Sequence, residues 1–169
     1  MSKFYKSAED WIDNLGLIRH PEGGWFRETY RSTEYIERKH LPVRFSGDRS
    51  FSTAIYFLLK SSEFSAFHKI RQDELWHFHC GSSLAIHIID ENNEYQKHIL
   101  GLQGRQHPQL AVKAGCLFAA KVKDPDSYTL VSCTVAPGFD FDDFEMPARN
   151  QLLDLYPQYK SVIMKLTKE

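Results

Sequence analysis

The chain has 169 residues, of which 42% are hydrophobic and 25% charged. This composition is typical of one folded domain and excludes disordered, collagen-like and coiled-coil chains. With 21 Lys and Arg against 22 Asp and Glu, the formal net charge is -1, so the chain lacks the basic excess of a general binder of nucleic acid or anionic membranes.

Three cysteines, Cys80, Cys116 and Cys133, are an odd number with wide spacing. This pattern is typical neither of a disulfide framework nor of a zinc ribbon, so we expect reduced thiols packed in the core. Residues 1–6 lack the apolar centre of a signal peptide, and apolar stretches such as 54–59 are too short to span a bilayer. A cytoplasmic location without a membrane partner is therefore expected.

The first predicted element is a short helix. Ser7 to Asp10 resembles a capping box, Trp11, Ile12 and Leu15 form a helical apolar stripe, and Gly16 is a stop signal. A turn-rich segment follows at residues 20–24, where the pair Gly23-Gly24 permits backbone angles that other residues avoid. The polar stretch 33–49 is predicted to be a surface loop.

From Ser50 onward the sequence consists of short β-rich runs separated by turn residues. The predicted strands are 51–59, 64–70, 74–79, 84–90, 95–100, 109–112, 116–122 and 128–136. Eight short strands at this spacing indicate an all-β sandwich or barrel, and the lack of long helical patterns between them disfavours a parallel α/β sheet. Helices are predicted again around 147–155 and from Pro157 to Met164. We expect one domain over residues 1–169.

The window from His68 to Gly81 holds three histidines, an aspartate and a glutamate. In a strand that starts at Glu74, alternation puts Glu74, Trp76 and Phe78 on one face and His77 and His79 on the other. The pair His77 and His79 can bind a metal ion. Alternatively, the two side chains lie on an outer face and hydrogen-bond to their neighbours.

His68 and Glu74 lie on adjacent runs joined by the polar turn 69–73. If this turn is a hairpin, both side chains can face inward together. A histidine beside a carboxylate in an aromatic-walled cavity is a candidate acid–base pair. The alternative is a buried polar pair whose hydrogen bonds are satisfied within a small barrel.

Two further polar clusters are candidates for ligand binding. Arg27 and Arg31, next to Glu28, could hold an anion through bidentate contacts, or form exposed ion pairs along an edge strand. Lys69 adds positive charge near His68, or belongs to a solvated turn. In the segment 139–145, three Phe alternate with acids; the acids could bind a cation, or the Phe residues pack on the barrel while the acids stay solvated.

Several segments together resemble a known family. They are Leu17 to Ser32, Ser52 to Leu59, Phe67-His68 with Trp76-His77-Phe78, His107-Pro108-Gln109 and Cys133 to Phe139. In this order they are similar to the DUF985 group of the cupin superfamily, also called cupin-5, and the match spans most of the chain. The resemblance implies a double-stranded β-helix, or jelly roll, with short terminal helices, usually assembled as a homodimer.

The cupin superfamily has a metal-binding pattern in two motifs, and this chain departs from it. Glu74, six residues and Gly81 fit the first motif, and His68 fits its second histidine. Ala66 stands at the first histidine position and Phe118 at the histidine of the second motif. A transition metal normally needs three or four protein ligands, so His68 and Glu74 alone would make a weak site, and we expect no cofactor.

The resemblance implies a pocket for a small molecule, and the metal-free cupin epimerases offer the nearest analogy. The first hypothesis is an epimerase or isomerase of a sugar or nucleotide-sugar, with His68 as base and Glu74 as its acid or orienting partner. Arg27, Glu28, Thr53 and Lys69 would contact polar groups of the ligand, and Trp76, Phe78 and Phe118 would wall the pocket. The alternatives are a non-catalytic carbohydrate-binding cupin, and a metalloenzyme that adds His77 or His79 to His68 and Glu74.

Overall fold

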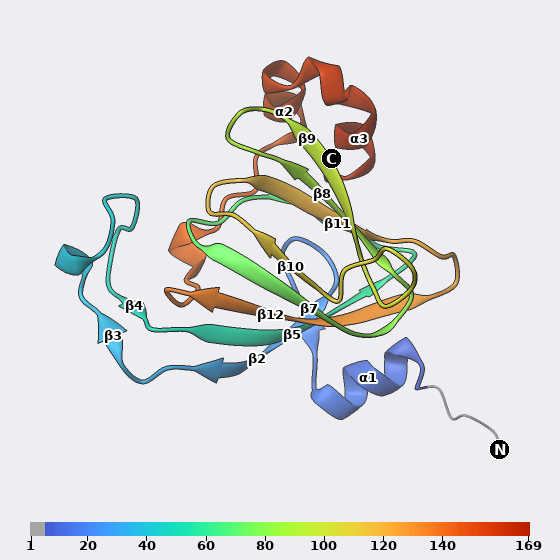
Figure 1. Ribbon diagram of the computed structural model, residues 1–169, viewed down its shortest axis with the longest axis horizontal. Helices are drawn as coiled ribbons and strands as arrows, with labels where there is room; N and C mark the ends of the chain where they lie inside the picture. Colours follow the sequence, from blue (N-terminus) through green and yellow to red (C-terminus); the bar gives the residue numbers. More distant parts are fainter. Residues whose placement is uncertain (1–5) are drawn as a thin grey trace.

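The computed structural model describes residues 6–169, so most of the N-terminal segment that was searched for a signal peptide lies outside the described residues. The chain begins with helix α1 (Ala8–Leu15) and then forms two main antiparallel sheets, with two short helices at its C-terminal end (Figure 1). No helix among the described residues is long and apolar enough to cross a bilayer.

Helix α1 starts at the predicted capping box. Ser7 Oγ accepts a hydrogen bond from the Asp10 amide at 3.1 Å, and the Asp10 carboxylate accepts one from the Ser7 amide at 2.8 Å. Gly16 ends the helix in the left-handed conformation, with φ 60°. Its apolar face, including Trp11 and Leu15, packs against one end of the larger sheet.

The larger sheet has six strands in the order β1-β2-β5-β12-β7-β10. The bounds are β1 Ile18–Arg19, β2 Trp25–Arg31, β5 Thr53–Lys60, β12 Tyr128–Ala136, β7 Asp73–Gly81 and β10 Gln109–Val112. The smaller sheet has the order β6-β11-β8-β9. Its strands are β6 Ser65–His68, β11 Leu117–Val122, β8 Leu84–Ile89 and β9 Tyr95–Leu100. Neighbouring strands run antiparallel in both sheets, which confirms the predicted all-β jelly roll.

The main core lies between the two sheets. Trp76 of β7 is 1% exposed and packs edge-on against Phe57 at 5.8 Å and Phe118 at 6.3 Å between ring centroids. Glu74 is buried on this inner face as well, whereas His79 is exposed. The predicted alternation along β7 is therefore confirmed.

The turn 69–73 does not form a hairpin, because β6 and β7 belong to different sheets. The chain crosses here from the smaller sheet to the larger one. His68 and Glu74 consequently reach the same cavity from different sheets.

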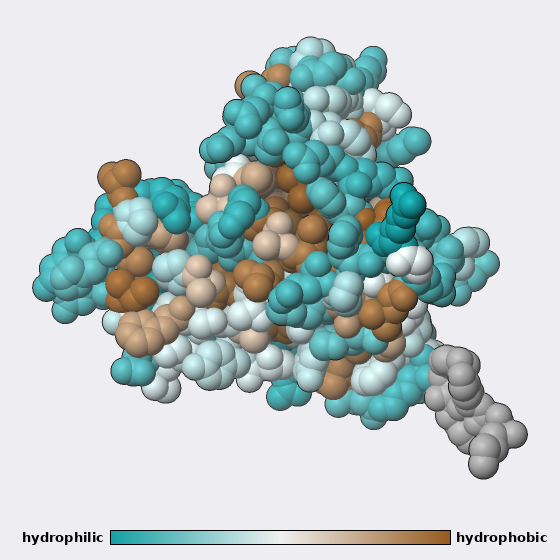
Figure 2. Space-filling model, viewed as in Figure 1, coloured by the Kyte–Doolittle hydropathy of each residue, from teal (hydrophilic) through white to brown (hydrophobic). Residues whose placement is uncertain are grey.

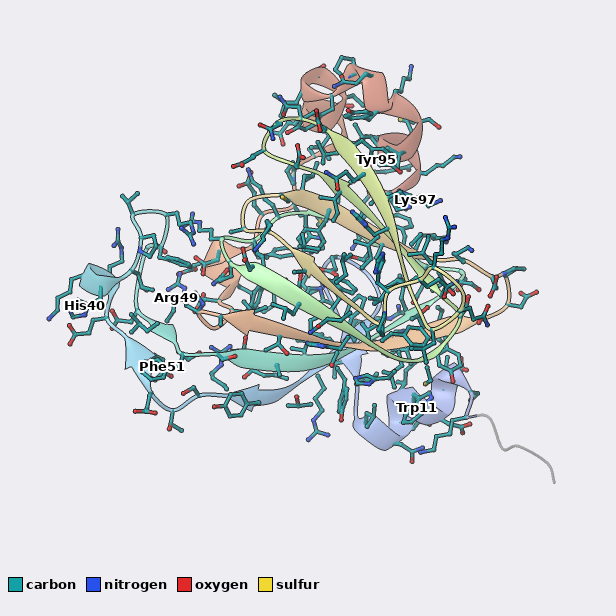
Figure 3. The ribbon with its side chains drawn as sticks, in the orientation of Figure 1. Trp11, His40, Arg49, Phe51, Tyr95 and Lys97 are labelled. Atoms are coloured by element: carbon teal, nitrogen blue, oxygen red, sulfur yellow. The ribbon has the colours of Figure 1, made fainter. Side chains whose placement is uncertain are left out.

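The stretch 33–49, predicted to be a surface loop, contains regular secondary structure. It forms β3 (Tyr35–Ile36), which pairs with β4 (Arg49–Ser50), and a 3-10 turn η1 (Arg38–His40). These elements make an arm that projects from the sheets, with His40 near its tip and Arg49 toward the body (Figures 1 and 3). Arg49 is not solvated but buried, 4% exposed.

The C-terminal helices α2 (Arg149–Leu155) and α3 (Lys160–Lys165) lie on the outer side of the smaller sheet, joined by the 3-10 turn η3 (Pro157–Tyr159). Leu152 and Ile163 pack with Phe67 in a second apolar cluster. The three cysteines are free thiols, as predicted; Cys116 and Cys133 are buried and Cys80 is half-buried.

Candidate functional site

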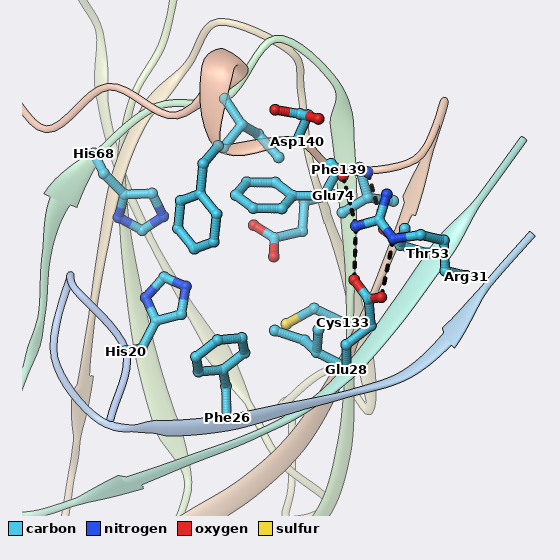
Figure 4. A pocket seen from close by; sticks show the side chains of 14 residues that line it. His20, Phe26, Glu28, Arg31, Thr53, His68, Glu74, Cys133, Phe139 and Asp140 are labelled. Carbon is cyan, nitrogen blue, oxygen red and sulfur yellow. Dashed lines mark hydrogen bonds and ion pairs between the residues drawn. The ribbon is translucent and has the colours of Figure 1, made fainter. Parts of the chain in front are cut away.

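A cavity of about 220 Å³ opens between the two sheets (Figure 4). Its wall combines aromatic rings with several ionisable groups. The lining residues are His20, Phe26, Glu28, Arg31, Thr53, Ile55, His68, Ile70, Glu74, Cys133, Val135, Phe139, Asp140 and Phe141.

Four of the nine residues predicted for the site line this cavity: Glu28, Thr53, His68 and Glu74. The five others lie outside its wall, for reasons of strand geometry. Arg27 alternates with Phe26 on β2, so its guanidinium turns outward and donates to the Leu15 carbonyl at 3.0 Å. Beyond Glu28 a register shift in β2 redirects the chain, and Arg31 is the arginine that lines the cavity.

Lys69 points to the surface, where its Nζ pairs with Glu145 at 3.2 Å. Trp76, Phe78 and Phe118 belong to the core next to the cavity rather than to its wall. Phe118 still supports the site indirectly, since its ring lies 4.1 Å from the His68 ring.

His68 is held by hydrogen bonds at both ring nitrogens. Its Nδ1 lies 2.7 Å from the Ala66 carbonyl oxygen, so Nδ1 carries the proton and donates it. Its Nε2 lies 3.1 Å from Glu22 Oε2. Burial lowers the pKa of His68 to about 4 and raises the pKa of Glu22. His68 is therefore neutral at pH 7, and its Nε2 faces the Glu22 carboxyl group.

Glu22 is buried, has several polar contacts, and was not predicted as a site residue from the sequence. Besides His68, it accepts a hydrogen bond from Ser65 Oγ at 2.8 Å. Its position depends on the next residue, Gly23, which has φ 116° and lies so close to β6 that a Cβ atom would be 2.1 Å from the Phe64 carbonyl oxygen. The Gly pair in the sequence was the available signal, because it marks a close approach of two backbones.

His20 is the second missed residue. The Glu22 amide donates to His20 Nδ1 at 3.3 Å, and burial lowers the pKa of His20. The ring is therefore neutral at pH 7 with its proton on Nε2. Figure 4 shows this ring directed toward the centre of the cavity, opposite Glu74. It packs edge-on against Phe26, with centroids 4.6 Å apart.

Glu74 directs its carboxyl group into the cavity between the aromatic rings (Figure 4). Burial, with the nearby Glu22 as a second cause, raises the pKa of Glu74 to about 8. Cys133 of the neighbouring strand β12 also lines the cavity, and burial followed by Glu74 raises the pKa of its thiol. Glu74 is thus a carboxyl group that exchanges a proton close to neutral pH.

The segment 138–145, which includes the 3-10 turn η2 (Phe141–Asp143), covers the cavity. Phe139 and Phe141 line it, and Phe144 stacks at 5.3 Å from the His68 ring, which confirms the packing predicted for this aromatic segment. The prediction that its acids stay solvated is wrong for Asp143. This carboxylate is buried and accepts two hydrogen bonds of 2.6 Å from the Arg49 guanidinium.

At the mouth, Arg31 forms a bidentate ion pair with Glu28, at 2.9 and 2.7 Å, and donates to the Phe139 carbonyl at 3.0 Å (Figure 4). The predicted edge-strand ion pair therefore exists, with Arg31 rather than Arg27. Thr53 Oγ1 accepts from the Phe139 amide at 2.9 Å, so it too holds the cover.

The residues present do not fit the metal site of the wider superfamily. Both nitrogens of His68 bond to protein groups, and Ala66 and Phe118 occupy two ligand positions. Within residues 6–169, no three His, Cys, Asp or Glu side chains are grouped as a metal ion requires. His77 instead lies on the outer face of β7, where its ring nitrogens contact Gln109 and Thr134.

Two antiparallel sheets around a ligand-sized cavity define a small jelly-roll protein. The chain belongs to the cupin superfamily family DUF985 (Cupin_5), whose model matches residues 9–147. A solved structure from Shewanella oneidensis is 39% identical with a TM-score of 0.88, covering 97% of this chain and 99% of the other.

Two further relatives support the assignment. A hypothetical protein from Leishmania major is 34% identical, with a TM-score of 0.86, over 97% of this chain and 100% of that one. An uncharacterized protein of Saccharomyces cerevisiae is 29% identical over 81% of this chain and 73% of its own length. Oxalate decarboxylase from Bacillus subtilis, at 14% identity and a TM-score of 0.55 over 89% of this chain and 37% of its own, shares the fold alone.

Proposed function

We propose that this cupin is a metal-independent isomerase or epimerase that moves a proton next to the carbonyl group of a small sugar. The observation that carries the proposal is the pairing of Glu74 with His20 across an enclosed, aromatic-walled cavity. The Glu74 carboxyl group exchanges a proton near pH 8, and the neutral His20 ring is a hydrogen-bond donor.

The reaction follows from these two protonation states. The Glu74 carboxylate removes the proton from the carbon next to the carbonyl, and the C–H electron pair forms a carbon–carbon double bond. The carbonyl electrons move to oxygen, where the His20 Nε2–H stabilises the enediolate through a hydrogen bond. Glu74 then returns the proton to the former carbonyl carbon while the hydroxyl proton of the adjacent carbon passes to the enediolate oxygen, which interconverts an aldose and a ketose. If Glu74 instead returns the proton to the opposite face of the same carbon after the intermediate turns, that carbon is inverted.

We propose for His68 a positioning role in place of the catalytic role expected from the sequence. Its two ring nitrogens are engaged by Ala66 and Glu22, so neither is free to accept a substrate proton. We assign His68 and Glu22 to holding the loop that carries His20. Glu74 replaces His68 as the base, since a base with a pKa near the working pH is the most effective.

The size of the cavity limits the substrate. Its volume of about 220 Å³ lies below the roughly 300–1,000 Å³ typical of pockets for drug-sized ligands. A sugar of a few carbons fits this space, whereas the nucleotide part of a nucleotide-sugar would extend beyond the mouth. Phe26, Phe139 and Phe141 supply apolar faces for the C–H side of a sugar ring or chain.

The test is turnover of small aldoses and ketoses, followed by NMR, in wild type and Glu74→Gln. Removing a general base typically lowers the rate about 10²- to 10⁴-fold, so we expect the variant to lose turnover. The matched control is His77→Asn on the outer face of the same strand, which should retain it. Turnover that survives Glu74→Gln unchanged contradicts the assignment of the base.

A non-catalytic sugar-binding cupin is the alternative, because the same cavity could hold a ligand without changing it. The buried hydrogen bonds of His68 and Glu22 are also what a rigid binding site requires. Saturable binding of an aldose without conversion, in wild type at pH 8, favours this alternative.

A further inference from the structure

We propose that the site accepts uncharged carbonyl substrates and rejects anionic ones, such as sugar phosphates and sugar acids, and that Glu28 and Asp140 at its mouth set this selectivity. The inference rests on the proposed function for the reaction, but it concerns binding and is tested without turnover. It starts from the charges that face the cavity.

The mouth of the cavity carries more negative than positive charge. Among the described lining residues, Glu28 and Asp140 are carboxylates, and Arg31 is the one guanidinium. The interior contributes no compensating cation, because His20 and His68 are neutral at pH 7. While Glu74 is protonated, below its pKa of about 8, two carboxylates against one guanidinium leave a net charge of -1 on the lining.

Arg31 is the cation of the lining that an anionic ligand would bind, and its guanidinium is already paired with Glu28. Its Nε and one terminal nitrogen donate to the two Glu28 oxygens, the bidentate geometry that a substrate carboxylate or phosphate would use. The same terminal nitrogen donates to the Phe139 carbonyl. An anionic substrate therefore has to displace an existing carboxylate.

Nearby basic side chains do not replace Arg31. Arg27 points to the Leu15 carbonyl, Lys69 pairs with Glu145 on the surface, and Arg49 is buried with Asp143. Each lies outside the cavity wall. The remaining negative charge at the mouth therefore faces any substrate that enters the cavity.

The experiment removes the negative charges at the mouth and uses inorganic phosphate as the anionic probe. Glu28→Gln combined with Asp140→Asn changes the charge of the lining by two and leaves Arg31 uncompensated. Arg31 and Glu28 are about one third exposed, 36% and 39%, so substitution at the mouth should preserve the fold. The matched control adds Arg31→Gln to the double variant. Histidine ring NMR signals of His20 and His68 report binding inside the cavity.

We expect phosphate to bind the double variant at least about tenfold more tightly than wild type, and the triple variant to lose this gain. Saturable phosphate binding by wild type at the cavity overturns the proposal. So does a double variant that gains no phosphate affinity. If these binding results hold while no uncharged aldose is converted, only the proposed function fails.

Discussion

The two buried glutamates of the cavity differ in what they contact. Glu22 bonds to Ser65 at 2.8 Å and His68 at 3.1 Å, so its oxygens are committed to the protein. Glu74 directs its carboxyl group into the cavity. Burial, with repulsion from the nearby Glu22 as a second cause, raises the pKa of Glu74 to about 8. This division leaves Glu74 as the group that can receive a substrate proton.

The raised pKa of Glu74 predicts a pH-dependent stability. The folded state holds the proton up to about pH 8, whereas an unfolded chain releases it near 4.5. The stabilisation is fully present below pH 4.5 and is lost as the pH rises through 8. Urea unfolding at pH 5 and pH 9 should show wild type losing up to about 4 kcal/mol relative to Glu74→Gln. An equal change in both proteins would contradict the raised pKa.

At the scale of single residues, the sequence was informative where strand alternation applies. The pattern Glu74, Trp76 and Phe78 predicted the inner face of β7, and Glu74 does face the cavity. His20 could not be found in this way, because it lies in a turn whose direction depends on the tertiary contact of Gly23 with β6. The role of His68 depended on Glu22, which a local pattern does not reveal.

Among the elements, the cover segment 138–145 depends on one buried ion pair. Asp143 is 2% exposed, accepts hydrogen bonds from Nε and one terminal nitrogen of Arg49, and also accepts one from Gln72 Nε2 at 2.6 Å. This network ties the cover of the cavity to the arm formed by β3 and β4 (Figure 3). It therefore positions Phe139 and Phe141 over the ligand space.

Asp143→Asn should destabilise the protein, because the Arg49 guanidinium stays buried without its counter-charge. We expect a loss of about 3–5 kcal/mol in the free energy of unfolding, measured with urea. Asp142→Asn, at the exposed neighbouring position, is the control and should change it by less than about 0.5 kcal/mol. Equal effects of the two substitutions would contradict the role of the buried Arg49–Asp143 ion pair.

Element boundaries were predicted best where turn residues enclose a strand on both sides. The runs 95–100, 109–112 and 128–136 match β9, β10 and β12 residue for residue. The pairing of strands was harder to predict, because residues 69–73 read as a hairpin turn but cross between the two sheets. On strand β2, ordinary alternation with Phe26 and Glu28 turns the predicted Arg27 outward, and the register shift beyond Glu28, which the sequence does not reveal, brings Arg31 to the cavity.

On the scale of the whole molecule, the arm formed by β3 and β4 projects beyond the two main sheets (Figure 1). Figure 2 shows hydrophobic side chains on it, and Tyr35, Val43 and Phe51 are 58%, 91% and 46% exposed. Apolar side chains gathered on one projection are typical of a contact surface. The homodimer implied by the family resemblance stays a prediction.

Sedimentation equilibrium tests the homodimer. We expect the mass of two 19.7 kDa chains, and a shift toward the monomer when Val43 and Tyr35 are both replaced by charged residues. A wild-type protein that sediments as a monomer at all concentrations would refute the dimer.

The central claim is that Glu74 moves a proton next to a carbonyl group, and deuterium exchange tests it most directly. Wild type incubated with a small aldose in D₂O should place deuterium on the carbon next to the carbonyl. The rate should rise between pH 6 and pH 9 as Glu74 loses its proton near 8, and Glu74→Gln should abolish the exchange. An aldose that binds in the cavity and gains no deuterium at any of these pH values would contradict the account.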